Sequence, residues 1–156
     1  MLLNEIEIKG EKMDNQTVKE RFAKKYLSDY IEEKQKKLTE ELGGFYAFTN
    51  ERFKEQAQQG VKYVRYGSFG FILPKNNIDK FEKGLENIIK KGIEQDKKEH
   101  TKKQIIWREL ANYEVQYNYG ELSQLIEHFK DYDYTKKDIL NEYDKYIKYC
   151  IDNDLI

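Results

Sequence analysis

Three polar side chains near residue 110 have the types that acid–base chemistry uses. Glu109, Asn112 and Glu114 provide two carboxylates and an amide within one short stretch. On a helix, positions three and four apart are neighbours, so Glu109 would lie beside Asn112 and Tyr113. Such groups can transfer protons, but they more often tie a helix end to the next turn by hydrogen bonds. An enzyme built on Glu109, Asn112 and Glu114 is therefore an alternative, and our leading expectation is a non-enzymatic protein.

The other reactive residue types give little support to catalysis. The two histidines, His100 and His128, do not have the spacing of a metal-binding pair. A single cysteine, Cys150, rules out an internal disulfide and a zinc site built from several cysteines. The segment Gly67–Gly70 lacks the third glycine and the lysine of a phosphate-binding loop. We expect no metal and no cofactor.

The last third of the chain combines acidic residues with tyrosines. Residues 109–156 hold 11 Asp and Glu against 5 Lys and Arg. Tyrosine supplies amphipathic contact area at protein interfaces, and an acidic surface is attracted to a basic groove on a partner. We expect a partner-binding surface made of Tyr117, Tyr119, Asp131, Tyr132, Asp133, Tyr134, Asp138, Glu142 and Asp144.

The middle of the chain is mildly basic. Residues 75–108 hold 10 Lys and Arg against 6 Asp and Glu. A protein that binds a phosphate backbone usually has a stronger basic excess. A nucleic-acid-binding or regulatory module is therefore an alternative, and it would use Lys90, Lys91, Lys97, Lys98, Lys102 and Lys103.

Length and composition predict one folded domain over residues 1–156, with 1–14 as a tail or edge strand. The chain has 156 residues and a net charge of −1, and its 13 Tyr and 8 Phe argue against disorder. No apolar run approaches the roughly 20 residues of a membrane span. The first residues lack a signal-peptide pattern. We expect a cytoplasmic protein.

Apolar periodicity predicts mostly helix. A helix over 17–42 begins at the capping box of Thr17 and Glu20 and ends at Gly43-Gly44. We expect it to pack on a sheet through Phe22, Tyr26 and Ile31. Three further helical stretches are predicted. The first, over 77–113, is one long or broken helix, the second covers 122–129, and the third covers 135–151 and begins at a capping box of Thr135 and Asp138.

Between these helices the pattern changes to short strands. The stretches 45–48, 61–66 and 71–73 are predicted strands, with a short helix over 51–59 and a hairpin turn at 67–70. Pro74 ends the third strand. The polar stretch 94–104 is expected to face water or a partner, and 115–120 is either a strand or a turn. The fold class is α+β: mostly helical, with a small antiparallel sheet of two to three strands packed on helices.

The order of these motifs resembles a family of small, mostly phage-encoded proteins of unknown function. Its Phe-Phe-Ala-Phe-like strand corresponds to Phe45-Tyr46-Ala47-Phe48, and its glycine-containing hairpin to residues 63–71. Its Glu-Leu-x-Asn-His-Glu element corresponds to residues 109–114, where Tyr113 replaces the histidine. The resemblance covers about residues 43–120, which leaves the first and last helices outside it.

The resemblance implies an accessory protein of a phage or mobile element, without implying an activity. Proteins of this kind often bind and block a host protein. We therefore expect an inhibitor of a host protein, and in the narrowest form an anti-CRISPR inhibitor of a nucleic-acid-targeting defence nuclease.

Overall fold

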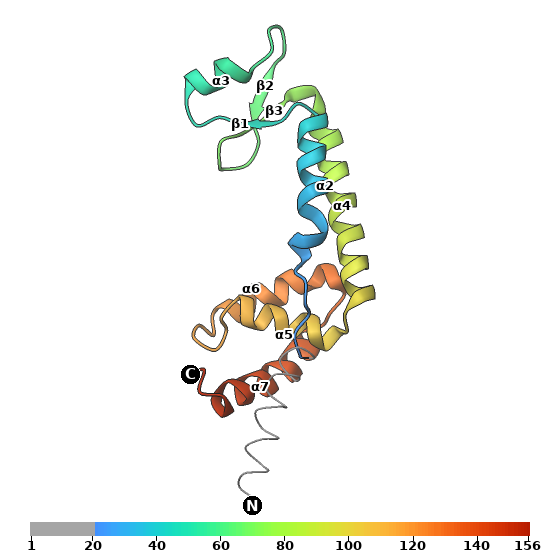
Figure 1. Cartoon of the computed structure of the whole chain (residues 1–156), viewed down its shortest axis with the longest axis vertical. Helices are drawn as coiled ribbons and strands as arrows, with labels where there is room; N and C mark the ends of the chain where they lie inside the picture. The colour runs from blue at the N-terminus through green and yellow to red at the C-terminus, as the bar shows by residue number, and fades with distance from the viewer. Residues whose placement is uncertain (1–20) are drawn as a thin grey trace, which may run out of the picture. The chain divides into compact units, whose positions relative to one another are not determined.

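The computed structural model describes residues 21–156, and its chain divides into two compact units (Figure 1). The sheet unit comprises Leu27–Gly92. The helical unit comprises 21–26 and Ile93–Ile156 among the described residues. Helix α4, Ile78–Glu99, contributes residues to both units. The predicted single domain stays a prediction, and each unit is described separately below.

The sheet unit contains a three-stranded antiparallel sheet and its helices. Helix α2 spans Leu27–Glu41 and is followed by strand β1, Phe45–Tyr46. Helix α3 spans Asn50–Gln56 and begins at Thr49, whose side chain accepts a hydrogen bond from the Arg52 backbone nitrogen. Strands β2, Tyr63–Arg65, and β3, Phe71–Pro74, complete the sheet in the order β1-β3-β2, and a short 3-10 turn, Lys75–Asn77, leads into α4.

The register of the strands gives the sheet two different faces. Tyr46 pairs with Phe71, and Val64 pairs with Leu73, so these side chains share one face. On that face Phe71 and Leu73 form a core with Phe81 of α4, against which Leu38 and Leu42 of α2 pack. On the other face, the rings of Phe45, Phe53 and Tyr63 pack together, with centroids 5.4 to 6.1 Å apart. Helix α3 therefore packs on the second face.

Two glycines let α2 and α4 approach closely within the sheet unit. A Cβ atom on Gly84 would lie 2.8 Å from Cδ1 of Leu38, and one on Gly92 would lie 2.5 Å from Cγ2 of Ile31. Glycine inside a helix costs about 1 kcal/mol relative to alanine. The close packing of α2 explains why α4 tolerates that cost at both positions.

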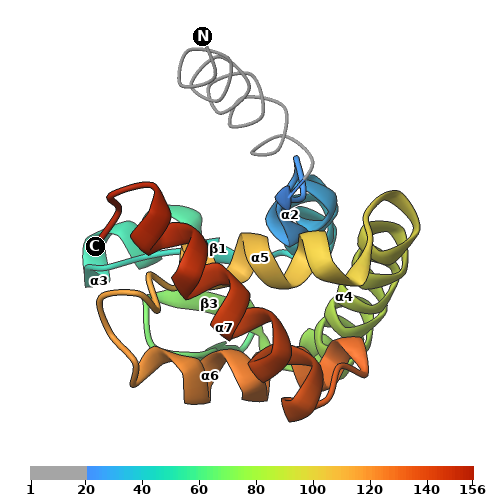
Figure 2. The same cartoon turned by 90° about the horizontal axis from the view of Figure 1, so that it is seen from below.

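The helical unit is built from α5, α6 and α7 around an apolar core. Helix α5 spans Lys102–Asn112, α6 spans Glu121–His128, and a 3-10 turn, Phe129–Tyr132, precedes α7, Lys136–Asp152. Figure 2 shows α7 lying across α5. The fully buried core includes Ile105, Ile106, Leu110, Leu125, Phe129 and Ile139.

Several sequence predictions are confirmed in the described part of the chain. The fold class is α+β, mostly helical with a three-stranded antiparallel sheet. Thr135 and Asp138 form the predicted capping box of the last helix. The ambiguous stretch 115–120 consists of turns. None of the described helices is long and apolar enough to cross a membrane.

The prediction of one continuous helix over 17–42 is wrong, because residues 22–26 are not helical. Helix α2 begins after this break, at Leu27, whereas the proposed capping box at Thr17 and Glu20 and the tail 1–14 lie outside the described residues. The ring of Phe22 belongs to the helical unit, where it packs edge-on against Trp107 and Tyr149. Nearby, the Ala23 backbone nitrogen donates to the Gln104 carbonyl over 3.1 Å. These tertiary contacts outweigh the helical periodicity of residues 22–26.

The other two residues of that prediction are also placed differently. Tyr26 is 46% exposed, and Ile31 packs against Gly92 of α4. Helix α2 meets the sheet core one or more turns further along, through Leu38 and Leu42.

The polar stretch 94–104 does not face water throughout. Asp96 has an exposed fraction of 0%. Of the two forms predicted for 77–113, one long helix or a broken one, the structure has the broken form. The break lies near His100, and Thr101 starts α5 with a capping box in which Gln104 is the partner. The break separates the sequence into α4 and α5.

Candidate functional site

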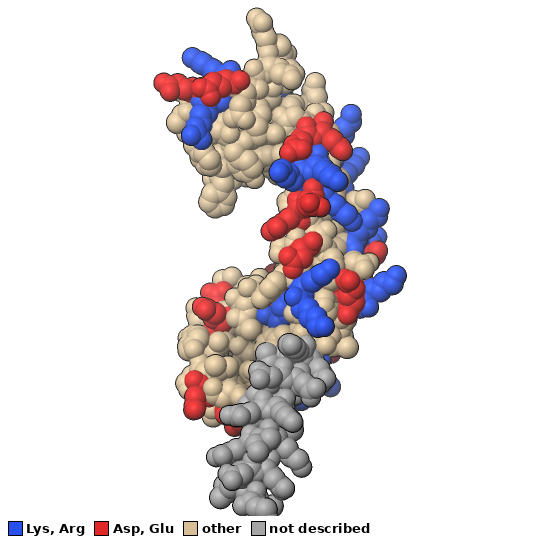
Figure 3. Space-filling model, in the orientation of Figure 1, with Lys and Arg blue, Asp and Glu red and all other residues tan. Residues whose placement is uncertain are grey.

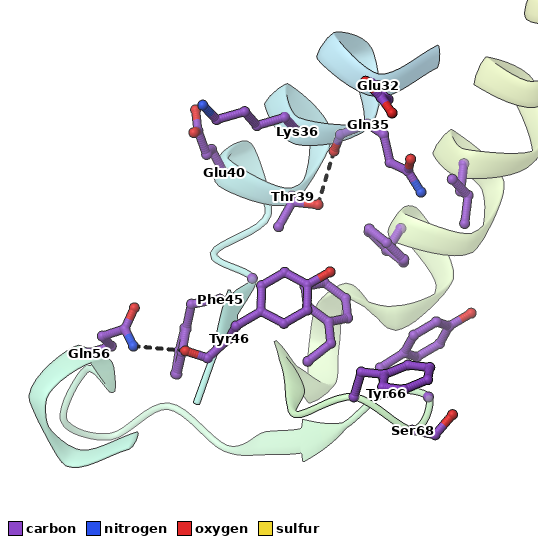
Figure 4. Close-up of a pocket in the computed structure, with 16 residues that line it drawn as sticks. Glu32, Gln35, Lys36, Thr39, Glu40, Phe45, Tyr46, Gln56, Tyr66 and Ser68 are labelled. Carbon is purple, nitrogen blue, oxygen red and sulfur yellow. Dashed lines mark hydrogen bonds between the residues drawn. The ribbon is translucent and has the colours of Figure 1, made fainter. Parts of the chain in front are cut away.

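A groove in the sheet unit is the strongest candidate for a binding site. It has a volume of about 750 Å³ and lies between α2, β1, the β2–β3 turn and α4 (Figure 4). Six aromatic residues line it: Phe45, Tyr46, Tyr66, Phe69, Phe71 and Phe81. A volume of this size is typical of ligand-binding clefts.

Local structure explains why two of these aromatic side chains remain exposed. Alternation along an extended segment puts Phe45 and Tyr46 on opposite faces of the sheet. Tyr46 is 57% exposed while its ring contacts Phe71, with centroids 5.2 Å apart. Phe69 is 78% exposed, at the tip of the β2–β3 turn. That turn is tight because Gly70 has a φ of +70° and lies against the Phe48 ring, which leaves no room for a Cβ atom.

Polar side chains from α2 and α3 form the rim of the groove. Glu32, Lys36 and Glu40 recur at four-residue spacing on α2, and so line one side of the groove. Gln56 of α3 donates from Nε2 to the Tyr46 carbonyl over 3.1 Å, as Figure 4 shows. The bond satisfies the Tyr46 carbonyl on β1, which is an edge strand of the sheet. It thereby fixes the segment that carries Tyr46.

Tyr66 connects the floor of the groove to α4. Its hydroxyl donates to Oε1 of Glu82 over 3.1 Å. Burial raises the pKa of Tyr66, and the nearby Glu82 carboxylate raises it further. Tyr66 is therefore neutral at physiological pH. Aromatic faces beside carboxylates suit non-covalent binding of another molecule.

A second polar cluster lies buried in the helical unit around Asp96. Arg108 donates from Nη1 to Oδ1 and from Nη2 to Oδ2 of Asp96, each over 2.9 Å. The Tyr132 hydroxyl donates to Oδ2 over 2.7 Å, and Nδ1 of His100 donates to Oδ1 over 2.9 Å. The carboxylate thus accepts four hydrogen bonds.

The pKa values in this cluster follow from burial and pairing. Burial alone would raise the pKa of Asp96, but the hydrogen bonds from Arg108, Tyr132 and His100 hold it below its ordinary value. Burial and the bond to Asp96 raise the pKa of Tyr132. Asp96, Arg108 and Tyr132 are at most 2% exposed, so the cluster is closed to a substrate. Its hydrogen bonds hold the helical unit together.

Only some residues of the predicted partner-binding surface are exposed to solvent. Tyr132 and Tyr134 are 0% and 7% exposed, so their inclusion in that surface is wrong. Both rings pack with Phe129 in the core because the turn at Phe129–Tyr132 directs them inward. Burial raises the pKa of Tyr134 to about 12.

Two acidic residues of the same surface already have partners within the helical unit. Asp138 caps α7 and accepts a hydrogen bond from Nζ of Lys102 over 3.3 Å. Glu142 accepts a hydrogen bond from Nε1 of Trp107 over 2.7 Å. The remaining members are exposed: Tyr117, Tyr119, Asp131, Asp133 and Asp144.

The side chains proposed for the nucleic-acid alternative are all exposed: Lys90, Lys91, Lys97, Lys98, Lys102 and Lys103. Figure 3 shows lysine and arginine side chains along α4, with acidic side chains between them. Lys97 donates to the Tyr132 carbonyl over 3.0 Å. Lys102 and Lys103 lie over the rings of Tyr134 and Trp107. Lys90, Lys91 and Lys98 are the exposed members for which no such contact is described.

The three residues of the enzyme alternative differ in their surroundings. Glu109 is 6% exposed and accepts a hydrogen bond from Nε of Arg108 over 3.1 Å. Asn112 and Glu114 are exposed, and Glu114 has a φ of 51° in the turn after α5. Glu109 therefore belongs to the buried Asp96 cluster, whereas the other two lie at the surface.

Sequence reasoning missed the groove, although it identified the segments that form it. The stretches 45–48 and 67–70 were predicted to be a strand and a hairpin turn, without a prediction of which face their aromatic side chains occupy. The sequence signal for the groove was the alternation in Phe45-Tyr46-Ala47-Phe48. In a strand, every second residue lies on the same face, so Tyr46 is on the face opposite to Phe45.

Comparison with known proteins gives a family match that is longer than the stretch of about residues 43–120 covered by the sequence motifs. No curated protein matches the chain. No solved structure matches it either. A family model described as a family of unknown function (DUF7659) matches residues 27–149. The match includes α2 and most of α7, so our expectation that the first and last helices lie outside the family is wrong. The chain belongs to this family of unknown function, DUF7659.

Proposed function

We propose that this chain is a non-enzymatic binding protein whose groove in the sheet unit receives a segment of another protein. The observation that carries the proposal is the exposure of Tyr46 and Phe69, at 57% and 78%, beside a groove of about 750 Å³. Burying apolar surface contributes about 25 cal/mol per Å². Large aromatic side chains at the edge of a groove supply that area when a partner covers them.

The narrower proposal is an accessory protein of a phage or mobile element that inhibits a host protein in the host cytoplasm. The partner we propose is a nucleic-acid-targeting defence nuclease, as in anti-CRISPR inhibition. Support comes from the exposed acidic side chains of Asp131, Asp133 and Asp144 in the helical unit. Nucleases of this type hold nucleic acid in basic channels, and acidic side chains are attracted to such channels.

Affinity purification with matched variants tests the broad proposal. The full chain, Phe69→Ser and the control Ile151→Ser are used as baits in nuclease-treated host lysate. Ile151 is 56% exposed on α7 and so matches Phe69 as an exposed apolar residue away from the groove. We expect Phe69→Ser to lose the captured protein at least tenfold and Ile151→Ser to retain it. Equal capture by Phe69→Ser, or loss of capture after nuclease treatment, contradicts the proposal.

The narrower proposal has its own test. The chain is co-expressed with each of a panel of nuclease defence systems, and phage restriction is measured. Inhibition of one system that is lost in Phe69→Ser supports the inhibitor function. Unchanged restriction across the panel contradicts it.

A further inference from the structure

We propose that the groove binds the side chain of an arginine that a partner protein presents. This inference rests on the proposed function and names the chemistry of the partner segment. It follows from two features of the groove, its aromatic floor and the charges of its rim.

The floor is a closely packed group of aromatic rings, in which Phe71 and Phe81 are buried and Tyr46 is exposed. The ring centroids of Tyr46 and Phe71 are 5.2 Å apart, and those of Phe71 and Phe81 are 5.4 Å apart. Tyr66 packs against Phe81 at 5.4 Å, which extends the aromatic floor. The face of an aromatic ring carries partial negative charge and attracts a cation. A planar guanidinium can also stack on such a face, which an ammonium cannot do.

The rim adds negative charge in excess of positive charge. Among the residues that line the groove, Glu32 and Glu40 are the acidic ones and Lys36 is the basic one. The lining therefore carries one net negative charge, and Glu82 places a further carboxylate beside the Tyr66 hydroxyl. Carboxylates form short, charge-assisted hydrogen bonds with a guanidinium. A neutral or acidic segment would leave these carboxylates without a counter-charge.

The helical unit provides an example of the same arrangement within this chain. The guanidinium carbon of Arg21 lies 5.5 Å from the centre of the Trp107 ring and 5.0 Å from that of Tyr149. The groove offers two exposed rings, those of Tyr46 and Phe69, and no arginine is among its lining residues. An arginine from a partner would lay its methylene groups on these rings and turn its guanidinium toward Glu32 and Glu40.

A titration with small probes tests the assignment on the full chain. N-acetyl-arginine methylamide and its uncharged isostere, N-acetyl-citrulline methylamide, are added to isotope-labelled protein, and amide NMR shifts are followed. We expect the arginine probe to shift the signals of Tyr46, Gly67 and Phe69 to saturation, with an affinity at least fivefold above that of the citrulline probe. Equal affinities, or no shift at these three positions, overturn the assignment.

Charge variants of the rim sharpen the test. The double variant Glu32→Gln with Glu40→Gln should remove the preference for arginine, and Lys36→Gln should strengthen binding of the arginine probe about threefold by removing a like charge. These exposed residues on α2 can be changed without disturbing the core. A preference that survives the double variant also overturns the assignment. If citrulline binds as well as arginine while Phe69→Ser still loses its protein partner, the arginine assignment fails and the proposed function stands.

Discussion

Arg108 binds Asp96 through two parallel hydrogen bonds of 2.9 Å, at a position where the two residues are 2% and 0% exposed. The pair joins α4 to α5, and Tyr132 adds a third connection from the turn before α7. A buried ion pair of this kind is strongly destabilising to break, because it leaves a charge without a partner away from water.

The first prediction concerns this pair. Asp96→Asn should lower the free energy of unfolding by about 3 to 5 kcal/mol, because the Arg108 charge loses its main partner. Urea unfolding of the full chain measures the change. The control Asp131→Asn, at an exposed position in the same unit, should change stability by less than about 0.5 kcal/mol. A loss below about 1 kcal/mol for Asp96→Asn would show that the pair does not hold the unit together.

The second prediction is the pH dependence that follows from the pKa of Asp96. The folded pKa of Asp96 is lowered, so its ionised form stabilises the fold above the unfolded pKa of about 3.9. This contribution is lost as the pH falls below about 4 toward the folded pKa. Melting temperatures between pH 6 and pH 2 should therefore fall more steeply for the wild type than for Asp96→Asn. Parallel curves would contradict this role of the carboxylate.

The third prediction tests the approach of α2 to α4. Gly92→Ala should destabilise the sheet unit by about 1 to 3 kcal/mol, because its Cβ would lie 2.5 Å from Cγ2 of Ile31. In an open helix the same change stabilises by up to about 1 kcal/mol. Adding Ile31→Ala should recover part of the loss by making room. Thermal unfolding of the single and double variants measures both effects, and a stabilised Gly92→Ala would show that the helices are not tightly packed there.

The fourth prediction separates exposed acidic residues from those that have structural contacts. Asp131→Lys with Asp144→Lys should leave the melting temperature unchanged, because both side chains are exposed. Asp138→Lys should lower it, since Asp138 caps α7 and pairs with Lys102. If the acidic surface steers a basic partner, the Asp131 and Asp144 variant should slow association, most strongly at low salt. An unchanged rate at low salt argues against that steering.

Local sequence signals predicted several ends of helices and strands. Contacts between residues far apart in the sequence could not be predicted. Thr135 with Asp138, Gly43-Gly44 and Pro74 mark ends that depend on a few neighbouring residues, so they could be read from the sequence. Asp96 could not, because its partner Tyr132 is 36 residues away and a polar residue in a polar stretch predicts exposure. Tyr46 and Phe69 show the converse, since an aromatic residue in a strand or hairpin predicts burial until the partners of the strand are known.

Site-specific photo-crosslinking in the host cell tests the central claim most directly. The photoreactive residue p-benzoylphenylalanine replaces Phe69 at the groove, or Tyr117 or Ile151 at exposed positions of the helical unit. A binding protein that uses the groove should give one discrete covalent adduct from position 69, joined to an arginine-containing segment of a single partner, and none from position 151. An adduct from position 117 with none from position 69 would contradict the account and place the interface on the acidic helical unit.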